Sequence, residues 1–298
     1  MTDAAIARMD APIGARPIGD GFDRLTQRDF QRLAKFIQQY SGIKMPSSKV
    51  TMVEGRLRKR VRATGTGSLA EYCRLVFDDG GLEAEAIHLI DAVTTNKTEF
   101  FREPDHFRVL ADQVLPGIVT QRRVSAKEPI KIWSAACSTG AEPYTIAMVL
   151  AEFERQLPGL HGIILATDIC TEVLRTAQNG IYPESMIAPV PSDMRARYVM
   201  RSKDRSHGLV RIVPELRSAT RFGRLNLMDP EYRADRDMDV IFLRNILIYF
   251  DKPTQFAVLR RLCDHLRPGG HLFLGHSETL AGFDLPLRTV GNTVFRRI

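Results

Sequence analysis

Apolar residues recur at helical spacing near the start of the chain. Phe30, Leu33 and Ile37 are three and four residues apart, which places them on one face of a helix. Thr26 precedes this pattern as a candidate N-cap, and Gly42 follows it as a candidate terminator. The pattern therefore predicts a helix between these two residues.

Two further helices are expected before residue 90. An apolar stripe with a four-residue period predicts a helix over about residues 48–63, and Ser68 is placed to begin the next one. No stretch up to residue 90 has the pattern of a strand. We predict a flexible lead-in at residues 1–20 and a small all-helical domain at residues 21–90.

From residue 130 short apolar runs alternate with helical stretches, which is typical of a parallel sheet covered by helices. The runs LVRIV and SATRF interrupt this alternation and predict a small antiparallel β insert at about residues 195–222. The predicted fold is a Rossmann-like α/β domain at residues 116–298, joined to the helical domain by a linker helix at residues 91–115. Its strands are expected at Ile130–Ala135, Ile163–Thr167, Arg224–Leu227, Asp239–Leu243, His271–Gly275, Leu287–Val290 and Thr293–Arg297.

The first two strands of this domain are followed by residues suited to binding an adenosine. The first strand runs into a loop of small residues that leads to Gly140 and Glu142, and the second ends in Asp168. In Rossmann-like sheets such a loop and acid hold an adenosine, with the carboxylate on the ribose hydroxyls. The loop is not G-x-G-x-x-G, so it lacks the pyrophosphate cradle of a dinucleotide site. These features indicate S-adenosylmethionine as the cofactor.

These residue types also have simpler explanations. Glu142 lies near a helix N-terminus, where the helix dipole favours a carboxylate whatever it binds. Asp168 could be the N-cap of the next helix. Asn226–Leu227 and Asn245–Ile246 lie at the carboxyl ends of predicted strands, at the edge that faces the ligand crevice in open α/β sheets, but Asn is also common in turns.

Composition and charge narrow the class of protein. Apolar content of 44% and charged content of 26% are ordinary for a globular chain. No run of ~18 apolar residues predicts a membrane span, and the N-terminus lacks a signal core. The four cysteines have neither metal-ligand nor disulfide spacing. We expect a cytoplasmic protein without a metal, and the net charge of +7 suggests an acidic partner.

Five long segments of the chain match one known family in order. They are TTNKTEFFREPDHF (94–107), WSAACSTGAEPYTIA (133–147), ATDICTEVLRTAQNGIY (166–182), FLRNILIYFDKPTQ (242–255) and RPGGHLFLGHSETL (267–280). The chain resembles the CheR family, the glutamate O-methyltransferases of chemotaxis receptors. It departs from the family's pattern at two positions. Ala141 stands where the family usually has an acid, and Cys170 stands where it often has one.

The resemblance implies roles for single residues. Asn96, Thr98 and Arg102 are expected to bind the cofactor, Glu142 its methionine amino group, Asn226 and Leu227 its adenine, and Asn245 and Ile246 are expected to touch it. Arg102 and Tyr249 are expected to position the incoming carboxylate, although Tyr249 could equally be a packed core residue. If their segment is helical, Thr98 and Arg102 share a face, while Phe100 and Phe101 could simply pack the seam between the domains.

The predicted helix at residues 48–63 is strongly basic, which suggests that it binds an acidic partner. Arg56, Lys59, Arg60 and Arg62 could guide an acidic receptor helix to the active site, could form a solvated face, or could bind nucleic acid phosphates. The region has no interleaved aromatic residues for stacking bases, which disfavours nucleic acid. The resemblance also allows the β insert to bind a receptor's C-terminal tail by strand addition.

Three functions are compatible with these features: a receptor glutamate O-methyltransferase, a nucleic-acid methyltransferase, and a noncatalytic S-adenosylmethionine-binding signalling module. A glutamate acceptor is an anion at neutral pH, so the reaction needs no general base, and no catalytic triad is apparent. The loop typical of amino-directed nucleic-acid enzymes is missing where RNILIYF stands. The first function is therefore favoured, with chemoreceptor cytoplasmic domains as substrates.

Overall fold

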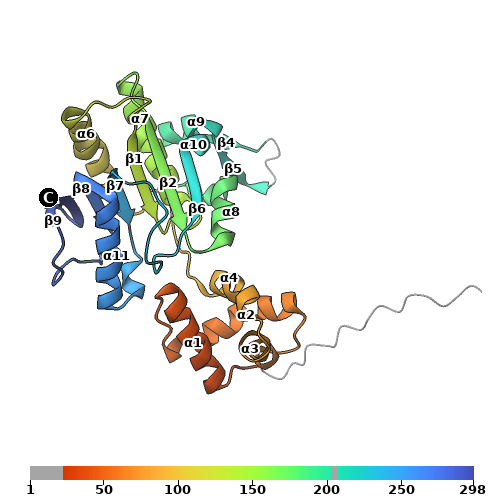
Figure 1. Ribbon diagram of the computed structural model, residues 1–298. Helices are drawn as coiled ribbons and strands as arrows, with labels where there is room; N and C mark the ends of the chain where they lie inside the picture. The colour runs from red at the N-terminus through yellow and green to blue at the C-terminus, as the bar shows by residue number, and fades with distance from the viewer. Residues whose placement is uncertain (1–22, 203–206) are drawn as a thin grey trace, which may run out of the picture.

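A computed structural model describes residues 23–202 and 207–298 of the chain. The predicted lead-in at residues 1–20 lies outside the described residues. Figure 1 shows a group of helices from the first third of the chain below an α/β domain, at the end to which the arrows of β1 and β2 point. No described helix is both long and apolar enough to cross a lipid bilayer.

The described part of the N-terminal region is helical, as predicted. It contains α1 (Gln27–Ser41), η1 (Ser47–Lys49), α2 (Val50–Thr64), α3 (Leu69–Phe77) and α4 (Leu82–Val93). The side chain of Thr26 accepts a hydrogen bond from the Asp29 amide (3.1 Å), and Ser68 caps α3 in the same way. Gly42 ends α1 with a left-handed φ of 74°. The apolar stripes of these helices pack against one another in a core of their own.

The prediction of a continuous linker helix at residues 91–115 is wrong for its central part. Residues 94–103 contain no helix, and regular structure resumes with α5 (Pro104–Val109), the π-helical turn η2 (Leu110–Val114) and α6 (Leu115–Gln121). Phe101 and Glu103 adopt left-handed φ values of 53° and 56°, and the proline after Glu103 disfavours a right-handed helix there. Thr98 and Arg102 therefore do not share a helix face. Phe100 packs in the core, 5.1 Å from the ring of Tyr182.

A seven-stranded sheet forms the α/β domain, as the predicted fold class requires. Its order is β6-β2-β1-β7-β8-β10-β9, with the first five parallel and β10 antiparallel to both its neighbours. The strands are β1 (Ile130–Ala135), β2 (Gly162–Asp168), β6 (Thr220–Arg224), β7 (Met238–Leu243), β8 (Leu266–Leu274), β9 (Leu287–Gly291) and β10 (Val294–Arg297). The strand order reverses between β1 and β7, and ligands bind in the crevice at such a switch point.

Helices cover both faces of this sheet. Because side chains alternate along a strand, Val240 and Phe242 of β7 pack in a core shared with α7 (Ala141–Gln156), and Ile241 and Leu243 pack with α11 (Lys252–His265). Two shorter helices, α8 (Thr171–Asn179) and α10 (Pro214–Ala219), flank β2 and β6.

One predicted strand was misplaced. The expected strand at Arg224–Leu227 is instead β6 at Thr220–Arg224, which pairs with β2 in parallel. Part of SATRF therefore belongs to the main sheet and not to the insert. Leu225 and Leu227 are buried against α11, so their apolar character reflects packing of a loop and not strand pairing.

The β insert is real but begins earlier than predicted. It is an antiparallel sheet of order β3-β5-β4, formed by β3 (Ile181–Pro183), β4 (Val199–Arg201) and β5 (Leu209–Ile212). It also holds η3 (Glu184–Ile187) and α9 (Ser192–Tyr198). The run LVRIV supplies β5, as expected.

Candidate active site

A cavity of about 220 Å³ lies where the carboxyl ends of β1, β2 and β7 meet the helical domain. The helical domain contributes Ile43, Met45 and Met52 to its wall, and the irregular segment after α4 crosses it. Most residues predicted to bind cofactor or to act in catalysis line this one cavity: Asn96, Thr98, Arg102, Glu142, Asp168, Asn226, Leu227, Asn245, Ile246 and Tyr249.

Gly140 is the predicted cofactor residue that the structure does not bring to the cavity. Its φ is 93°, and a Cβ atom there would lie 2.8 Å from both Ala177 Cβ and Tyr182 Oη. The position therefore requires glycine because the start of α7 packs closely against α8 and β3.

Asp168 is the buried acid at the end of β2. Its Oδ2 accepts a hydrogen bond from the Ser138 amide (2.8 Å) and its Oδ1 one from the Cys170 amide (2.9 Å). Burial raises the pKa of Asp168, against the effect of these amides. Ser138 itself has a left-handed φ of 52°, and such strained backbone clusters at functional sites.

The N-terminus of α8, which Asp168 could have capped, is held from the other domain. Asp91 of α4 accepts hydrogen bonds from the amide (2.8 Å) and hydroxyl (2.5 Å) of Thr171. Near this end of α8, Asp168 accepts from the amide of Cys170, just before the helix. Its outer lone pairs stay available to a ligand in the cavity.

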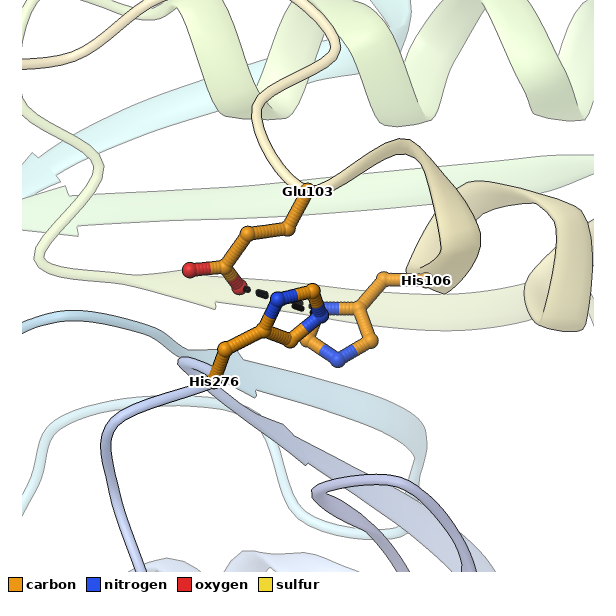
Figure 2. A group of neighbouring side chains, drawn as sticks. All are labelled: Glu103, His106 and His276. Carbon is orange, nitrogen blue, oxygen red and sulfur yellow. Dashed lines mark ion pairs between the residues drawn. The ribbon is translucent and has the colours of Figure 1, made fainter.

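Glu103 lies just before α5, beside two histidines (Figure 2). Its Oε2 is 3.4 Å from His106 Nδ1 and 4.0 Å from His276 Nε2. Burial, followed by the nearby charge of Arg244, lowers the pKa of His106 to about 4, so this imidazole is neutral at neutral pH.

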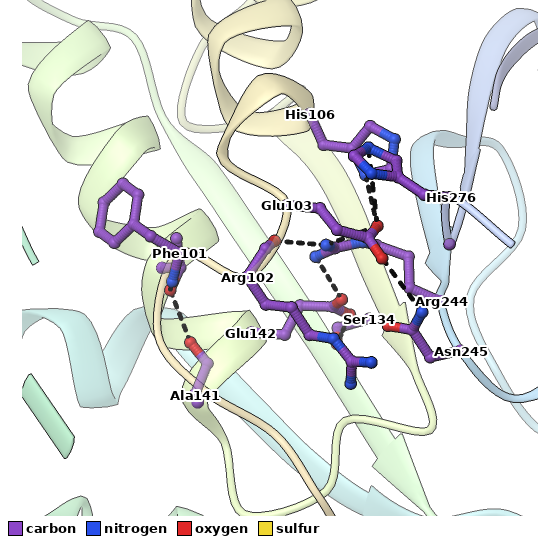
Figure 3. Close-up of polar contacts among 12 residues, drawn as sticks. Phe101, Arg102, Glu103, His106, Ser134, Ala141, Glu142, Arg244, Asn245 and His276 are labelled. Atoms are coloured by element: carbon purple, nitrogen blue, oxygen red, sulfur yellow. Dashed lines mark hydrogen bonds and ion pairs between the residues drawn. The ribbon is translucent and has the colours of Figure 1, made fainter. Parts of the chain in front are cut away.

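Arg244 connects Glu103 to the cavity (Figure 3). Its side chain is 2% exposed, with Nη2 3.0 Å from Glu103 Oε2 and Nη1 3.1 Å from Glu142 Oε2. It also donates to the carbonyl of Arg102. Ser134 Oγ donates to the other oxygen of Glu142 (2.7 Å). Burial raises the pKa of Glu142, and Arg244 acts against that rise.

The loop after β7 is clamped by a carboxylate. Glu278 accepts hydrogen bonds from the amides of Asn245 (3.0 Å), Leu247 (2.7 Å) and Gly275 (2.7 Å). Asn245 has a left-handed φ of 59°, and its side chain donates to Glu103 Oε1 (3.1 Å). Hydrogen bonds to Glu278 and Glu103 therefore fix the loop that carries Asn245 and Ile246 at the cavity.

The two predicted catalytic side chains have few competing partners. Arg102 donates to the carbonyl of Lys97 (3.3 Å), and no carboxylate of the described residues lies within ion-pair distance of it. Tyr249, in η5 (Leu247–Tyr249), makes no hydrogen bond through its hydroxyl within the described part of the chain; Lys49 lies 5.5 Å from its ring.

The predicted substrate-binding residues of α2 do not line the cavity. Arg60 pairs with Glu85 (2.7 Å), and Arg56 donates to the carbonyls of Val93 (2.6 Å) and Thr94 (2.8 Å), so both hold the helical domain together. Lys59 pairs with Glu172 of α8 (2.6 Å), and Arg62 is exposed. The lysines that do line the cavity are Lys49 and Lys97.

Sequence reasoning missed Asp91, Glu103, Arg244 and Glu278. Three of them lie inside the segments that carry the family resemblance, but none stands out by spacing or periodicity. Their partners are far away in the chain: Asp91 contacts a residue 80 positions on, and Arg244 contacts Glu103 141 positions back.

Comparison with known families agrees with this arrangement of domains. The profile of the CheR methyltransferase all-alpha domain matches residues 28–94, and that of the CheR methyltransferase SAM binding domain matches residues 96–295. The chain belongs to the CheR family. The α/β domain is thus an S-adenosylmethionine-binding methyltransferase domain, which agrees with the cofactor predicted from the loop after β1.

CheR relatives resemble the chain over most of its length. Chemotaxis protein methyltransferase 2 of Pseudomonas aeruginosa is 38% identical over 274 residues, which are 91% of this chain and 93% of the relative. The chemotaxis protein methyltransferase of Escherichia coli is 38% identical over 271 residues, 91% of each chain. That of Borreliella burgdorferi is 36% identical over 259 residues, 87% of this chain and 90% of the relative.

Proposed function

We propose that this CheR protein transfers a methyl group from S-adenosylmethionine to glutamate side chains in the cytoplasmic helices of chemoreceptors, which forms methyl esters. The observation that carries the proposal is the composition of the cavity. It combines the acids Glu142 and Asp168 with an arginine and a tyrosine, Arg102 and Tyr249, whose polar ends have no side-chain partner among the described residues.

The residues present fit the cofactor. The oxygens of Asp168 that accept backbone amides retain lone pairs for two ribose hydroxyls. Glu142 offers a buried negative charge to the methionine amino group, and Asn226, Leu227, Asn245 and Ile246 would border the rest of the molecule. When bound, S-adenosylmethionine supplies an electrophilic methyl group on a sulfonium centre.

The chain's own contribution is to orient the acceptor carboxylate and to remove water from around it. A glutamate acceptor has a pKa of about 4.3 and arrives as an anion, so no residue needs to remove a proton. The guanidinium of Arg102 and the hydroxyl of Tyr249 would hold one carboxylate oxygen while the other attacks. Because opposite charges cancel in this displacement, a cavity that excludes water favours it.

Positive charge near the cavity suits an acidic acceptor segment. Lys49, Lys97 and Arg102 line it, and Ile248, 54% exposed, offers an apolar contact in the same lining. These residues, more than those of α2, are placed to meet the receptor helix. A receptor tail at the insert is a second contact, because Ile181 and Met200 on its outer strands β3 and β4 are exposed.

The proposal is tested by transfer of a radiolabelled methyl group to receptor cytoplasmic fragments. We expect base-labile label on receptor glutamates that is lost when those glutamates are replaced by alanine. Arg102→Ala should lower turnover roughly 100-fold and cofactor affinity much less, because it positions the acceptor. Arg108→Ala, at an exposed arginine of α5, is the matched control.

Other outcomes would change the assignment. Label on RNA or DNA, suppressed by salt, would identify a nucleic-acid methyltransferase. Tight cofactor binding with no labelled acceptor would identify a noncatalytic module. If Arg102→Ala loses cofactor affinity and not turnover, Arg102 belongs to the cofactor site.

A further inference from the structure

The cluster of Glu103, His106 and His276 lies beside the cavity wall and has no part in the reaction proposed above. Figure 2 shows its three side chains converging, Glu103 and His106 from the start of α5 and His276 from the loop after β8. One oxygen or nitrogen atom from each lies within 4.8 Å of the other two. Glu103 Oε2 is 3.4 Å from His106 Nδ1, close to the separation of two ligands on a tetrahedral zinc ion, which is about 3.4 Å for bonds of about 2.1 Å.

His106 brings an unsatisfied nitrogen to this cluster. The residue is 1% exposed, and its Nδ1 has no hydrogen-bond partner among the residues that the structure describes. The other nitrogen, Nε2, lies 2.9 Å from Thr293 Oγ1, and that hydroxyl donates its proton to the carbonyl of Asn292 (2.8 Å). Because this hydroxyl can then only accept from the ring, we assign the ring proton to Nε2, which leaves Nδ1 with a lone pair 3.4 Å from a carboxylate oxygen of Glu103.

Two buried hydrogen-bond acceptors that face each other at 3.4 Å repel unless a cation lies between them. We propose that Glu103, His106 and His276 bind a divalent transition-metal ion of the zinc class, with one coordination position left open. The set of two imidazole nitrogens and one carboxylate oxygen is a known zinc ligand set and is unsuited to Mg²⁺, which prefers oxygen ligands.

The surroundings of the cluster support a cation. Two of the three ligands are oriented by an outer hydrogen bond, His106 by Thr293 and Glu103 by Asn245, as is usual around metal sites. Arg244 uses a second lone pair of Glu103 Oε2, and its own charge is balanced by Glu142. While no cofactor is bound, Glu103, Glu142 and Arg244 together carry one net negative charge, which an ion would balance.

The ion would have a structural role. It would join the start of α5 to the loop after β8, directly behind Arg244 and Asn245. Both of these residues line the cavity, so the ion would stiffen its wall. The spacing of 103, 106 and 276 explains why no metal was expected from the sequence.

The test is a titration of the full, tag-free chain with Zn²⁺, with Mg²⁺ as the negative control. We expect one equivalent of Zn²⁺ to bind with a micromolar Kd or tighter. His276→Ala removes an exposed ligand, so the variant should fold and should lose affinity by ~100-fold. His161→Ala, at an exposed histidine far from the cluster in the chain, should bind as the wild type does.

A second measurement separates this site from weak surface binding. Co²⁺ should give the wild type, but not His276→Ala, the intense visible absorption of a four- or five-coordinate ion. Zn²⁺ should raise the Tm of the wild type and the His161 variant, because an ion that binds only the folded state stabilises it. No stoichiometric Zn²⁺ binding, or equal affinity in wild type and His276→Ala, would overturn the proposal.

Discussion

At the scale of single residues, the candidate active-site cavity contains carboxylates whose hydrogen-bond partners are already in place. Asp168 is held by two backbone amides from different loops, so it is fixed before any ligand arrives. Prior fixation of this kind lowers the entropy cost of binding. The two acids of the cavity are thus oriented by the protein, Asp168 by amides and Glu142 by Arg244 and Ser134.

Asp168→Asn should weaken S-adenosylmethionine binding by roughly 10- to 100-fold, because hydrogen bonds to a charged group contribute about 1.5–3 kcal/mol. The amide NH₂ would also face a backbone N–H, since both carboxylate oxygens accept one. Isothermal titration calorimetry measures the change. Asp112→Asn, at an exposed acid of η2, is the matched control, and equal affinity in both variants would remove Asp168 from the cofactor site.

Arg244→Met should lower the free energy of unfolding by about 3–5 kcal/mol, because it leaves Glu103 and Glu142 as unpaired buried charges. Urea unfolding at neutral pH measures the loss. Without Arg244 the pKa of both acids rises, so the loss should shrink as the pH falls and they become neutral.

The exposed pair of Arg108 and Asp105 offers a contrast to Arg244. Arg108→Met should cost less than ~1 kcal/mol, since surface pairs contribute little. A loss of the same size in both arginine variants, or one that does not depend on pH, would contradict the pairing argument for Arg244.

At the scale of helices and strands, the local sequence pattern predicted each element correctly where interactions between nearby residues determine its bounds. Helix α1 begins after Thr26 and ends before Gly42, as expected. An N-cap and a terminating glycine affect only the backbone a few residues away, so the local sequence is enough to predict them. The alternation of apolar runs found β1, β2, β7 and β8 within a few residues of their observed bounds.

The failures at this scale have a common cause in contacts between distant residues. Leu225 and Leu227 are apolar because a loop is buried under α11, and no local pattern separates this from a strand. Residues 94–103 are irregular, and they are held by a distant residue, Thr145, which accepts a hydrogen bond from the Phe101 amide (3.1 Å). Asp91, Glu103, Arg244 and Glu278 escaped notice because their partners are far along the chain.

Strand β8 carries a pH-dependent contribution to stability. Burial, with a smaller effect of Arg296, lowers the pKa of His271 from 6.5 to about 4. The folded state therefore disfavours the protonated form, and the contribution of His271 is complete above pH 6.5 and is lost as the pH falls from 6.5 toward 4. Allowing for its partial exposure, the loss is ~2 kcal/mol.

His271→Gln should accordingly lose less stability than the wild type between pH 7 and pH 4, by about this amount. Chemical unfolding at a series of pH values measures the difference. His161→Gln, at an exposed histidine, should follow the wild-type curve. Parallel curves for His271→Gln and wild type would show that His271 does not titrate as proposed.

At the scale of the whole molecule, the two domains are joined at the cavity itself. Asp91 of the helical domain holds the first turn of α8, three residues after Asp168, and Asn226 donates to the carbonyl of Tyr40 (2.6 Å). The pair of Lys59 and Glu172 lies beside them at the surface. Polar groups from both domains therefore fix the seam beside the cavity.

Asp91→Asn should weaken both domain contact and cofactor binding. The amide can keep one hydrogen bond to Thr171 but loses the charge that caps α8, which costs about 1 kcal/mol. We expect a lower free energy of unfolding and a several-fold weaker cofactor Kd. Lys59→Gln removes only an exposed pair and should change neither; a Kd unchanged in Asp91→Asn would show that the seam does not influence the cofactor site.

The participation of the helical domain in the cavity wall has a consequence for motion. Thermodynamic reciprocity requires that a ligand which contacts both sides of the seam also makes separation of the two sides less favourable. Amide hydrogens of α1 and α4, many of them remote from the cavity, should then exchange with solvent more slowly when the cavity is filled. The amide exchange rates of the helical domain would therefore differ between the cofactor-free and the cofactor-bound protein.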